Sequence, residues 1–247
     1  MSGKTYTSAI KRLQGVPEIF TGGDLTMLFG WTSQAASTYL ANWKRAGLVK
    51  SLGGRSDVHM NLVANRRANP ELALIRAYPM AVKVGADVLR EAGWTTQIPR
   101  RPEVAVPKPG PIYKIDGFDL SGRTQKWFTL VRPGMDISSG SLARLRPAWA
   151  LADMVARALD GRVRDAWLLA PDDLDLDEAG RDPELAAASK AFGLKEDALT
   201  AARYEQIFDS LNKLPAGEKT GTMPIAPGQG RAALQESGAT AVRRAIC

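Results

Sequence analysis

Residues 32–45 read TSQAASTYLANWKR, and this stretch decides how the first part of the chain folds. Ala36, Leu40 and Trp43 recur at helical spacing, so they predict an amphipathic helix with a narrow apolar stripe. Thr32 suits the N-cap position because its hydroxyl can accept a hydrogen bond from a free backbone N–H group. We therefore expect a helix with one face buried in its own domain and the other face free.

The free face of this helix carries short polar side chains and ends in a cation. Its donors and acceptors are Thr32, Ser33, Gln34, Ser37, Thr38 and Lys44. Such side chains can reach base edges or phosphates in a DNA major groove, which is about 12 Å wide, and glutamine can pair bidentately with adenine. We expect these six residues to bind DNA.

The segments on either side predict a winged helix-turn-helix over residues 1–63. Residues 8–14 and 22–29 form two short apolar-faced segments that we expect to be helices, the second ended by Gly30. Residues 48–52 and 58–63 are predicted to form a β-hairpin around the turn GGRSD, which is the wing. Its DNA-binding candidates are Lys50 and Arg55, and Arg66 and Arg67 directly after the wing are candidate phosphate contacts.

Beyond a polar boundary at residues 64–70 the pattern predicts a mixed α/β domain over residues 68–213, so the expected fold class is α+β. A helix in two pieces, broken at Pro79, is expected over 71–92, with Val82, Val84, Val88 and Leu89 on its apolar face. Strands are expected at 97–99, 102–107, 111–120 and 126–133, and helices at 142–160, 185–193 and 196–212. Residues 214–247 are rich in Gly, Pro, Ala and Thr, so we expect a flexible tail.

The charge distribution favours a polyanionic partner for the first half of the chain. Residues 1–132 hold 19 Lys and Arg against 9 Asp and Glu, a net charge of +10, and residues 133–247 hold 14 against 17, a net of −3. The one cysteine, Cys247, excludes a disulfide within the chain. We expect a cytoplasmic protein with no membrane segment, because no apolar run is long enough to span a bilayer and no signal peptide is evident.

No motif indicates an enzyme, so we expect no catalytic residues, no cofactor and no metal. The one histidine, His59, lacks evident catalytic partners and is interpreted as a surface or packing residue. Asp173, Asp175 and Asp177 could in principle hold Mg²⁺, but a solvated loop and helix start is favoured for them. Arg100, Arg101, Arg144 and Arg146 are the best surface candidates of the second domain, and a structural or solvating role is favoured for each.

The chain resembles the AbiEi family of antitoxins from bacterial type IV toxin–antitoxin and phage-resistance systems. The resemblance covers residues 8–210 and rests on FTGGDLTMLFGWTSQAASTYLANWKRAGLVKSLG at 20–53, GWTTQIP at 93–99, the segments VAVP and KIDGFDL, and LRPAWALADMVARALDGRV at 145–163. The long segment after residue 215 has no counterpart in the family pattern.

This resemblance implies a transcriptional repressor that autoregulates its operon by binding inverted repeats in its promoter. It also implies an antitoxin that opposes a nucleotidyltransferase toxin without a stable complex. It maps the DNA contacts onto Ser33, Gln34, Ser37, Thr38 and the wing around Arg55, and the chain is expected to be a monomer or weak dimer that pairs on DNA. The alternatives are a DNA-binding regulator of a plasmid or mobile element, a nucleic-acid enzyme using the carboxylates at 172–178, and a protein-interaction module.

Overall fold

The computed structural model describes residues 8–108, 114–138, 140–160, 168–195 and 197–212. Residues 1–213 belong to one compact unit, and the second unit, 214–247, lies outside the described residues. The prediction of a flexible tail therefore concerns a part of the chain that the structure does not describe. In the described part, helices combine with a three-stranded and a five-stranded sheet, which confirms the α+β fold class.

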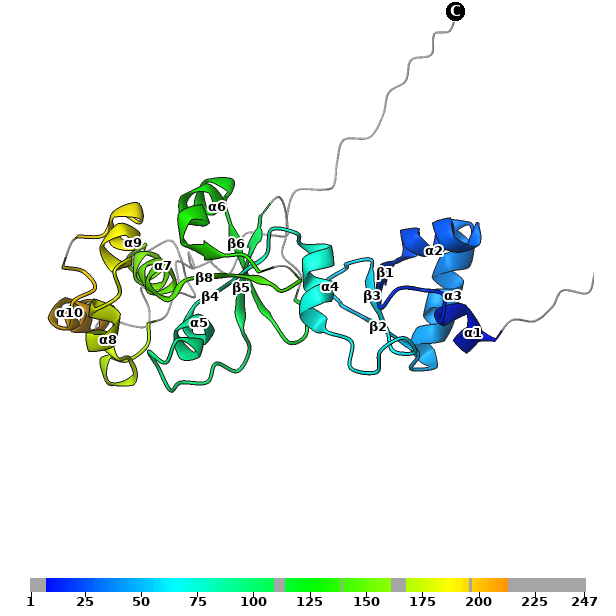
Figure 1. Cartoon of the computed structure of the whole chain (residues 1–247), viewed down its shortest axis with the longest axis horizontal. Helices are drawn as coiled ribbons and strands as arrows, with labels where there is room; N and C mark the ends of the chain where they lie inside the picture. The colour runs from blue at the N-terminus through cyan, green and yellow to red at the C-terminus, as the bar shows by residue number, and fades with distance from the viewer. Residues whose placement is uncertain (1–7, 109–113, 139, 161–167, 196, 213–247) are drawn as a thin grey trace, which may run out of the picture. The chain divides into compact units, whose positions relative to one another are not determined.

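The first sheet is antiparallel, with the strand order β1-β3-β2. Its elements in chain order are α1 (Ala9–Leu13), β1 (Ile19–Thr21), α2 (Gly22–Phe29), α3 (Ser33–Arg45), β2 (Val49–Ser51) and β3 (Val58–Asn61). The predicted helices and hairpin are confirmed, and β1 adds a third strand that the sequence pattern did not predict. Figure 1 shows α1, α2 and α3 on one side of this sheet and α4 (Pro70–Ala77) on the other.

Local hydrogen bonds explain where α2 and α3 begin. Thr21 and Asp24 form a capping box, in which each side chain accepts a hydrogen bond from the other residue's backbone N–H. Gly30 then ends α2 with φ of 62°, a left-handed conformation that glycine adopts without steric cost. Thr32 caps α3 as predicted, its hydroxyl accepting from the backbone N–H of Ala35 at 3.2 Å.

The second sheet has the strand order β6-β5-β4-β8-β7, with β4/β8 and β5/β6 parallel and the other two pairs antiparallel. Its strands are β4 (Val82–Val84), β5 (Glu103–Pro107), β6 (Asp119–Arg123), β7 (Met135–Asp136) and β8 (Ala143–Leu145). The helices are α4 (Pro70–Ala77), α5 (Ala86–Glu91), α6 (Gln125–Val131), α7 (Pro147–Leu159), α8 (Leu176–Gly180), α9 (Leu185–Ala191) and α10 (Ala201–Asn212), with short 3-10 helices at Arg132–Gly134 and Pro171–Asp173.

Several predicted elements of this second region are wrong. Val82 and Val84 lie on a strand rather than a helix, because they alternate around Lys83 and both are fully buried. Residues 126–133 are helical rather than extended, since Thr124 caps α6 through the backbone N–H of Trp127. Residues 97–99 belong to no strand, and β6 begins at Asp119, later than predicted. The helix predicted over 142–160 starts only at Pro147, because Ala143–Leu145 forms strand β8.

Among the described residues, the buried apolar side chains form three hydrophobic clusters. One fills the space between α1, α2, α3 and their sheet, and a large one surrounds α7. The third includes Val58 and Met60 from β3, Leu74 from α4 and Val104 from β5. Apolar side chains from both sides of the predicted boundary at 64–70 thus pack in one cluster, and the division into two domains stays a prediction.

A buried polar group, which the sequence pattern did not predict, links α7 to the second sheet. Asp153 on α7 is 1% exposed and accepts hydrogen bonds from Arg123 Nη2 at 3.0 Å and from Trp127 Nε1 at 2.7 Å. Beside it, Glu103 Oε1 accepts from Arg157 Nη1 at 2.5 Å. Because the buried charges are paired, the cluster fixes α6 and α7 against β5 and β6.

None of the helices in the described ranges combines the length and apolar character needed to cross a membrane.

Candidate nucleic-acid interface

Helix α3 buries one stripe and exposes the other, as predicted. Ala36, Leu40 and Trp43 are 2%, 6% and 3% exposed and pack in the core above the first sheet. All six predicted DNA-binding positions of this helix and its cap are exposed, namely Thr32, Ser33, Gln34, Ser37, Thr38 and Lys44. The structure therefore presents these side chains together on one surface.

The centre of this exposed face includes a residue that the sequence interpretation missed. At 100° per residue, Gln34, Thr38, Ala41 and Arg45 lie almost in line along the helix, opposite the buried stripe. Arg45 is exposed, and its Nη1 donates to Asn42 Oδ1 at 3.1 Å. The spacing i, i+4, i+7 and i+11 from Gln34 would have found Arg45, which lies one residue beyond Lys44.

The polar groups on this face differ in how far they are already engaged. Thr38 Oγ1 donates to the backbone carbonyl of Gln34 at 2.9 Å, which leaves the threonine hydroxyl oxygen as an outward acceptor. Within the described residues, the Gln34 side-chain amide makes no hydrogen bond to the protein. Both the donor and the acceptor of that amide are therefore available for a ligand.

The electrostatic character of α1 and α3 is uniformly positive. Lys11, Arg12, Lys44 and Arg45 lie on these two helices, and neither helix contains an Asp or Glu. Lys44 and Arg45 also occupy the last turn of α3, where cations are stabilised by the helix dipole. A surface with several cations and no carboxylate on its helices suits a polyanion.

The hairpin turn has an unusual backbone. Gly53, Gly54 and Arg55 have φ values of 94°, 62° and 59°, so three successive residues lie in the left-handed region. Arg55 and Lys50 are both exposed. Gly53 forms an isolated antiparallel bridge with Ile115, which ties one side of the turn to the segment before β6.

The structure does not bring Arg66 and Arg67 together with Arg55. Arg55 precedes β3, whereas Arg66 and Arg67 follow it, so they lie beyond opposite ends of that strand. Both arginines are exposed, and the backbone around them is held because Asn65 Nδ2 donates to Glu18 Oε1 at 3.0 Å. They belong to a separate basic turn beside β1.

His59 is buried on β3, the central strand of the first sheet, in agreement with the packing role considered from sequence. It is 3% exposed on β3, and its Nε2 lies 3.3 Å from Asp57 Oδ1. Burial, and then the nearby Lys44, lower the pKa of His59, while Asp57 opposes the shift. Asp57 Oδ2 also accepts from the backbone N–H of Gly22, so this carboxylate holds the hairpin to the start of α2.

The acidic stretch at 172–178 serves as a helix start. Asp175 caps α8, its Oδ1 accepting from the backbone N–H of Glu178 at 2.9 Å. The backbone carbonyl of Asp173 accepts from Thr95 Oγ1 at 2.6 Å. Across the ranges that the structure describes, no group of three or more His, Cys, Asp or Glu side chains is arranged to hold a metal ion.

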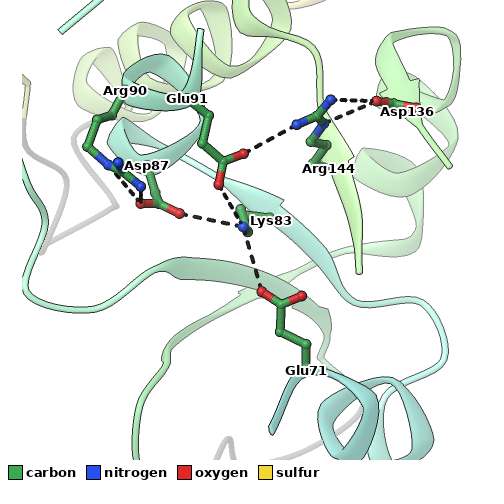
Figure 2. Close-up of polar contacts among 7 residues, drawn as sticks. All are labelled: Glu71, Lys83, Asp87, Arg90, Glu91, Asp136 and Arg144. Atoms are coloured by element: carbon green, nitrogen blue, oxygen red, sulfur yellow. Dashed lines mark hydrogen bonds and ion pairs between the residues drawn. The ribbon is translucent and has the colours of Figure 1, made fainter. Parts of the chain in front are cut away.

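A charged cluster lies around Lys83 on the central strand of the second sheet (Figure 2). Lys83 on β4 is ion-paired with Glu71, Asp87 and Glu91 at 3.7, 3.6 and 3.0 Å. Burial acts to lower the pKa of Lys83, but the hydrogen bond and charge of Glu91, with the other two carboxylates, raise it overall. Lys83 thereby connects α4 and α5.

Arg144 extends this cluster to β7. It pairs with Glu91 at 3.3 Å and with Asp136 at 2.9 Å, as Figure 2 shows. A cavity of about 390 Å³ lies beside these groups. Its cations and carboxylates already pair with one another, so Arg144 fits the structural role favoured from sequence.

Helix α4 also contacts the start of α2. Arg76 Nη2 lies 3.3 Å from Asp24 Oδ1, and Asp24 is the capping-box residue of α2. Glu71 at the other end of α4 pairs with Lys83. The helix therefore links the charged cluster to the helix that precedes α3.

Comparison with known proteins gives little beyond this geometry. No family model matches the chain, and no curated protein matches it. The crystal structure of RV2827C protein from Mycobacterium tuberculosis is similar at 15% identity and a TM-score of 0.48, over 81% of this chain and 79% of that one.

Proposed function

We propose that residues 9–61 form a winged helix-turn-helix that binds duplex DNA, with α3 as the reading helix and the β2–β3 hairpin as the wing. The observation that carries the proposal is the exposed face of α3. It presents Gln34, Thr38 and Arg45 in line, on a module whose helices α1 and α3 carry cations and no carboxylate.

The chemistry of this face suits the major groove. An α-helix fits a groove about 12 Å wide, and the Gln34 amide can pair bidentately with N6 and N7 of adenine. Arg45 can reach a phosphate or the O6 and N7 atoms of guanine. Lys50 and Arg55 on the hairpin supply the adjacent phosphate or minor-groove contacts, which set position rather than sequence.

The sequence resemblance to AbiEi antitoxins extends this proposal to the biological role. On that basis the protein represses its own operon through inverted repeats and opposes a nucleotidyltransferase toxin. Two copies on one operator would occupy half-sites one helical turn, or about 10 base pairs, apart, or a multiple of this. Co-expression with a nucleotidyltransferase encoded beside it tests the antitoxin role: rescue of growth supports this extension, and continued toxicity refutes it.

DNA binding is tested by titrating the protein onto its own upstream DNA at about 150 mM salt with competitor DNA present. The informative variant is Gln34→Ala/Thr38→Ala. The chain offers a matched control in Gln125→Ala/Thr129→Ala, because Thr129 Oγ1 donates to the backbone carbonyl of Gln125 on an exposed face of α6 in the same way.

The proposal predicts that wild type and control bind the upstream DNA specifically and that the α3 variant loses this specificity. Specific binding by all three proteins would remove α3 as the reader. If the wild type does not bind this DNA, the proposal of DNA binding is wrong, and residues 9–61 are expected to bind a protein partner instead.

A further inference from the structure

Arg12 on α1 lies against an aromatic stack that ends on α3. Phe29 and Trp31 stack at 4.5 Å between ring centroids, and Trp31 and Tyr39 stack at 4.2 Å with an interplanar angle of 19°. The guanidinium carbon of Arg12 is 4.7 Å from the Tyr39 centroid and 5.7 Å from the Trp31 centroid. Both distances are within the range of a cation–π contact.

This contact holds the guanidinium without using its hydrogen-bond donors. Among the residues that the structure describes, Arg12 has no carboxylate partner and donates no hydrogen bond. Arg90 and Arg144, by contrast, are paired with carboxylates. A planar cation packed against rings keeps its N–H groups for a planar or tetrahedral anion.

The position of Arg12 is also specific. At 100° per residue, Tyr39 lies between the buried stripe of α3 and the exposed face that carries Thr38, so the stack covers one flank of this helix. Lys11, exposed beside Arg12, adds a second cation on the same short helix, and no carboxylate lies on α1 or α3. Tyr39 is half-buried because its ring stacks on Trp31, and the same ring contacts the Arg12 guanidinium and orients it.

We propose that Arg12 is a phosphate-binding residue, held on the Trp31–Tyr39 stack so that it grips the phosphodiester backbone beside the groove that α3 enters. This inference rests on the proposed DNA-binding function and adds α1 to the interface. Arg12 would fix how α3 is oriented on the duplex without contributing to base choice.

The experiment measures DNA affinity of the full chain as a function of salt for wild type, Arg12→Gln and Arg181→Gln. Arg181 is an exposed arginine on the turn after α8, paired with Glu178 at 3.2 Å, so its variant controls for the loss of one positive charge. We expect Arg12→Gln to bind about tenfold more weakly to operator and competitor DNA alike. The slope of log affinity against log salt should shrink by about 0.9, which corresponds to one phosphate contact.

The role of the stack is tested by a double-mutant cycle with Tyr39→Leu, which keeps an apolar side chain and removes the ring. We expect Arg12→Gln to have at least threefold less effect on affinity in the Tyr39→Leu background than in wild type. Additive effects would overturn the positioning by Tyr39. Thermal unfolding of each variant ensures that affinity is compared only among folded proteins. Arg12→Met, which also removes the charge but keeps an apolar side chain against the rings, serves with the same expected results if Arg12→Gln does not fold.

The two levels of the proposal fail in different ways. If wild type binds its upstream DNA but Arg12→Gln matches Arg181→Gln in affinity and salt slope, the Arg12 assignment is wrong and DNA binding by α3 stands. If wild type shows no DNA binding at about 50 mM salt, where phosphate contacts are strongest, the proposed function itself fails.

Discussion

Asn61 Nδ2 donates a 2.7 Å hydrogen bond to the backbone carbonyl of Leu13, which joins the end of β3 to the end of α1. The same amide nitrogen donates to the carbonyl of Val16 at 2.8 Å. Its Oδ1 accepts from the backbone N–H groups of Val63 and Ala64 at 3.1 and 3.3 Å. Asn61 is fully buried, so this one side chain satisfies four backbone groups and positions α1 against the first sheet.

Asn61→Ala should therefore lower the free energy of unfolding by about 3 kcal/mol, because it leaves several buried backbone groups without partners. Asn65→Ala, at an exposed asparagine whose amide contacts Glu18, should cost less than about 1 kcal/mol. Urea unfolding of both variants measures the difference. Equal costs would mean that water replaces the Asn61 hydrogen bonds.

Asp153→Ala should lower the free energy of unfolding by about 3–5 kcal/mol, because it leaves Arg123 as a buried cation without its nearest carboxylate. The exposed Asp172→Ala should change stability by no more than about 0.5 kcal/mol. Replacing both partners, in Arg123→Met/Asp153→Leu, should recover much of the loss, since no unpaired charge remains. Chemical unfolding in which the double variant is no more stable than Asp153→Ala would contradict this account of the cluster.

The pH dependence of stability should reveal His59. Its pKa is lowered in the folded protein by burial and by Lys44, so the folded state favours the neutral ring. The unfolded chain binds the proton near the ordinary pKa of about 6.5, and stability is therefore complete above that pH and falls as the pH drops below it. We expect wild type to lose more stability between pH 7.5 and 5.5 than His59→Leu does.

No other histidine is present to imitate this effect, because the chain has only one. The test is the free energy of unfolding of both proteins at the two pH values. Parallel pH profiles for wild type and His59→Leu would show that His59 does not contribute.

Arg55→Gly should separate stability from DNA binding. Arg55 adopts a left-handed conformation at φ of 59°, which costs an L-residue about 1–2 kcal/mol and glycine almost nothing. We expect the free energy of unfolding of the variant to lie within about 1 kcal/mol of that of wild type, yet its DNA binding to be weaker than that of wild type. Unfolding and DNA titration are measured on the same preparation. A variant that keeps full affinity would remove Arg55 from the interface.

The elements around α3 could be predicted because their signals are local. Ala36, Leu40 and Trp43 define the buried stripe of α3. Gly30 ends α2 through its left-handed backbone, and Thr32 begins α3 through its capping hydroxyl. Strand β1 was missed because Ile19–Thr21 is too short to show alternation and acquires its pairing only from β3. Residues 126–133 contain Trp, Phe, Thr and Val, which favour strands, but Thr124 caps a helix there.

The candidate site shows the same division. The exposed residues of α3 follow from helical spacing, and the same spacing places Arg45 on the face opposite the buried stripe. The proposed role of Arg12 could not be predicted from sequence, because it depends on contacts among Arg12, Trp31 and Tyr39, which lie on three separate segments of the chain. The network of Asp153 was equally hidden, since a single Asp in an apolar helix does not reveal its partner on β6.

The most direct test of the central claim compares how wild type and Gln34→Ala read individual base pairs. The dissociation constant of each protein is measured on the upstream site with every base pair substituted in turn. We predict that wild type loses about 1–3 kcal/mol at one base pair of each half-site where Gln34→Ala is indifferent, while all other positions behave alike. Identical profiles for the two proteins would contradict the assignment of α3 as the reading helix.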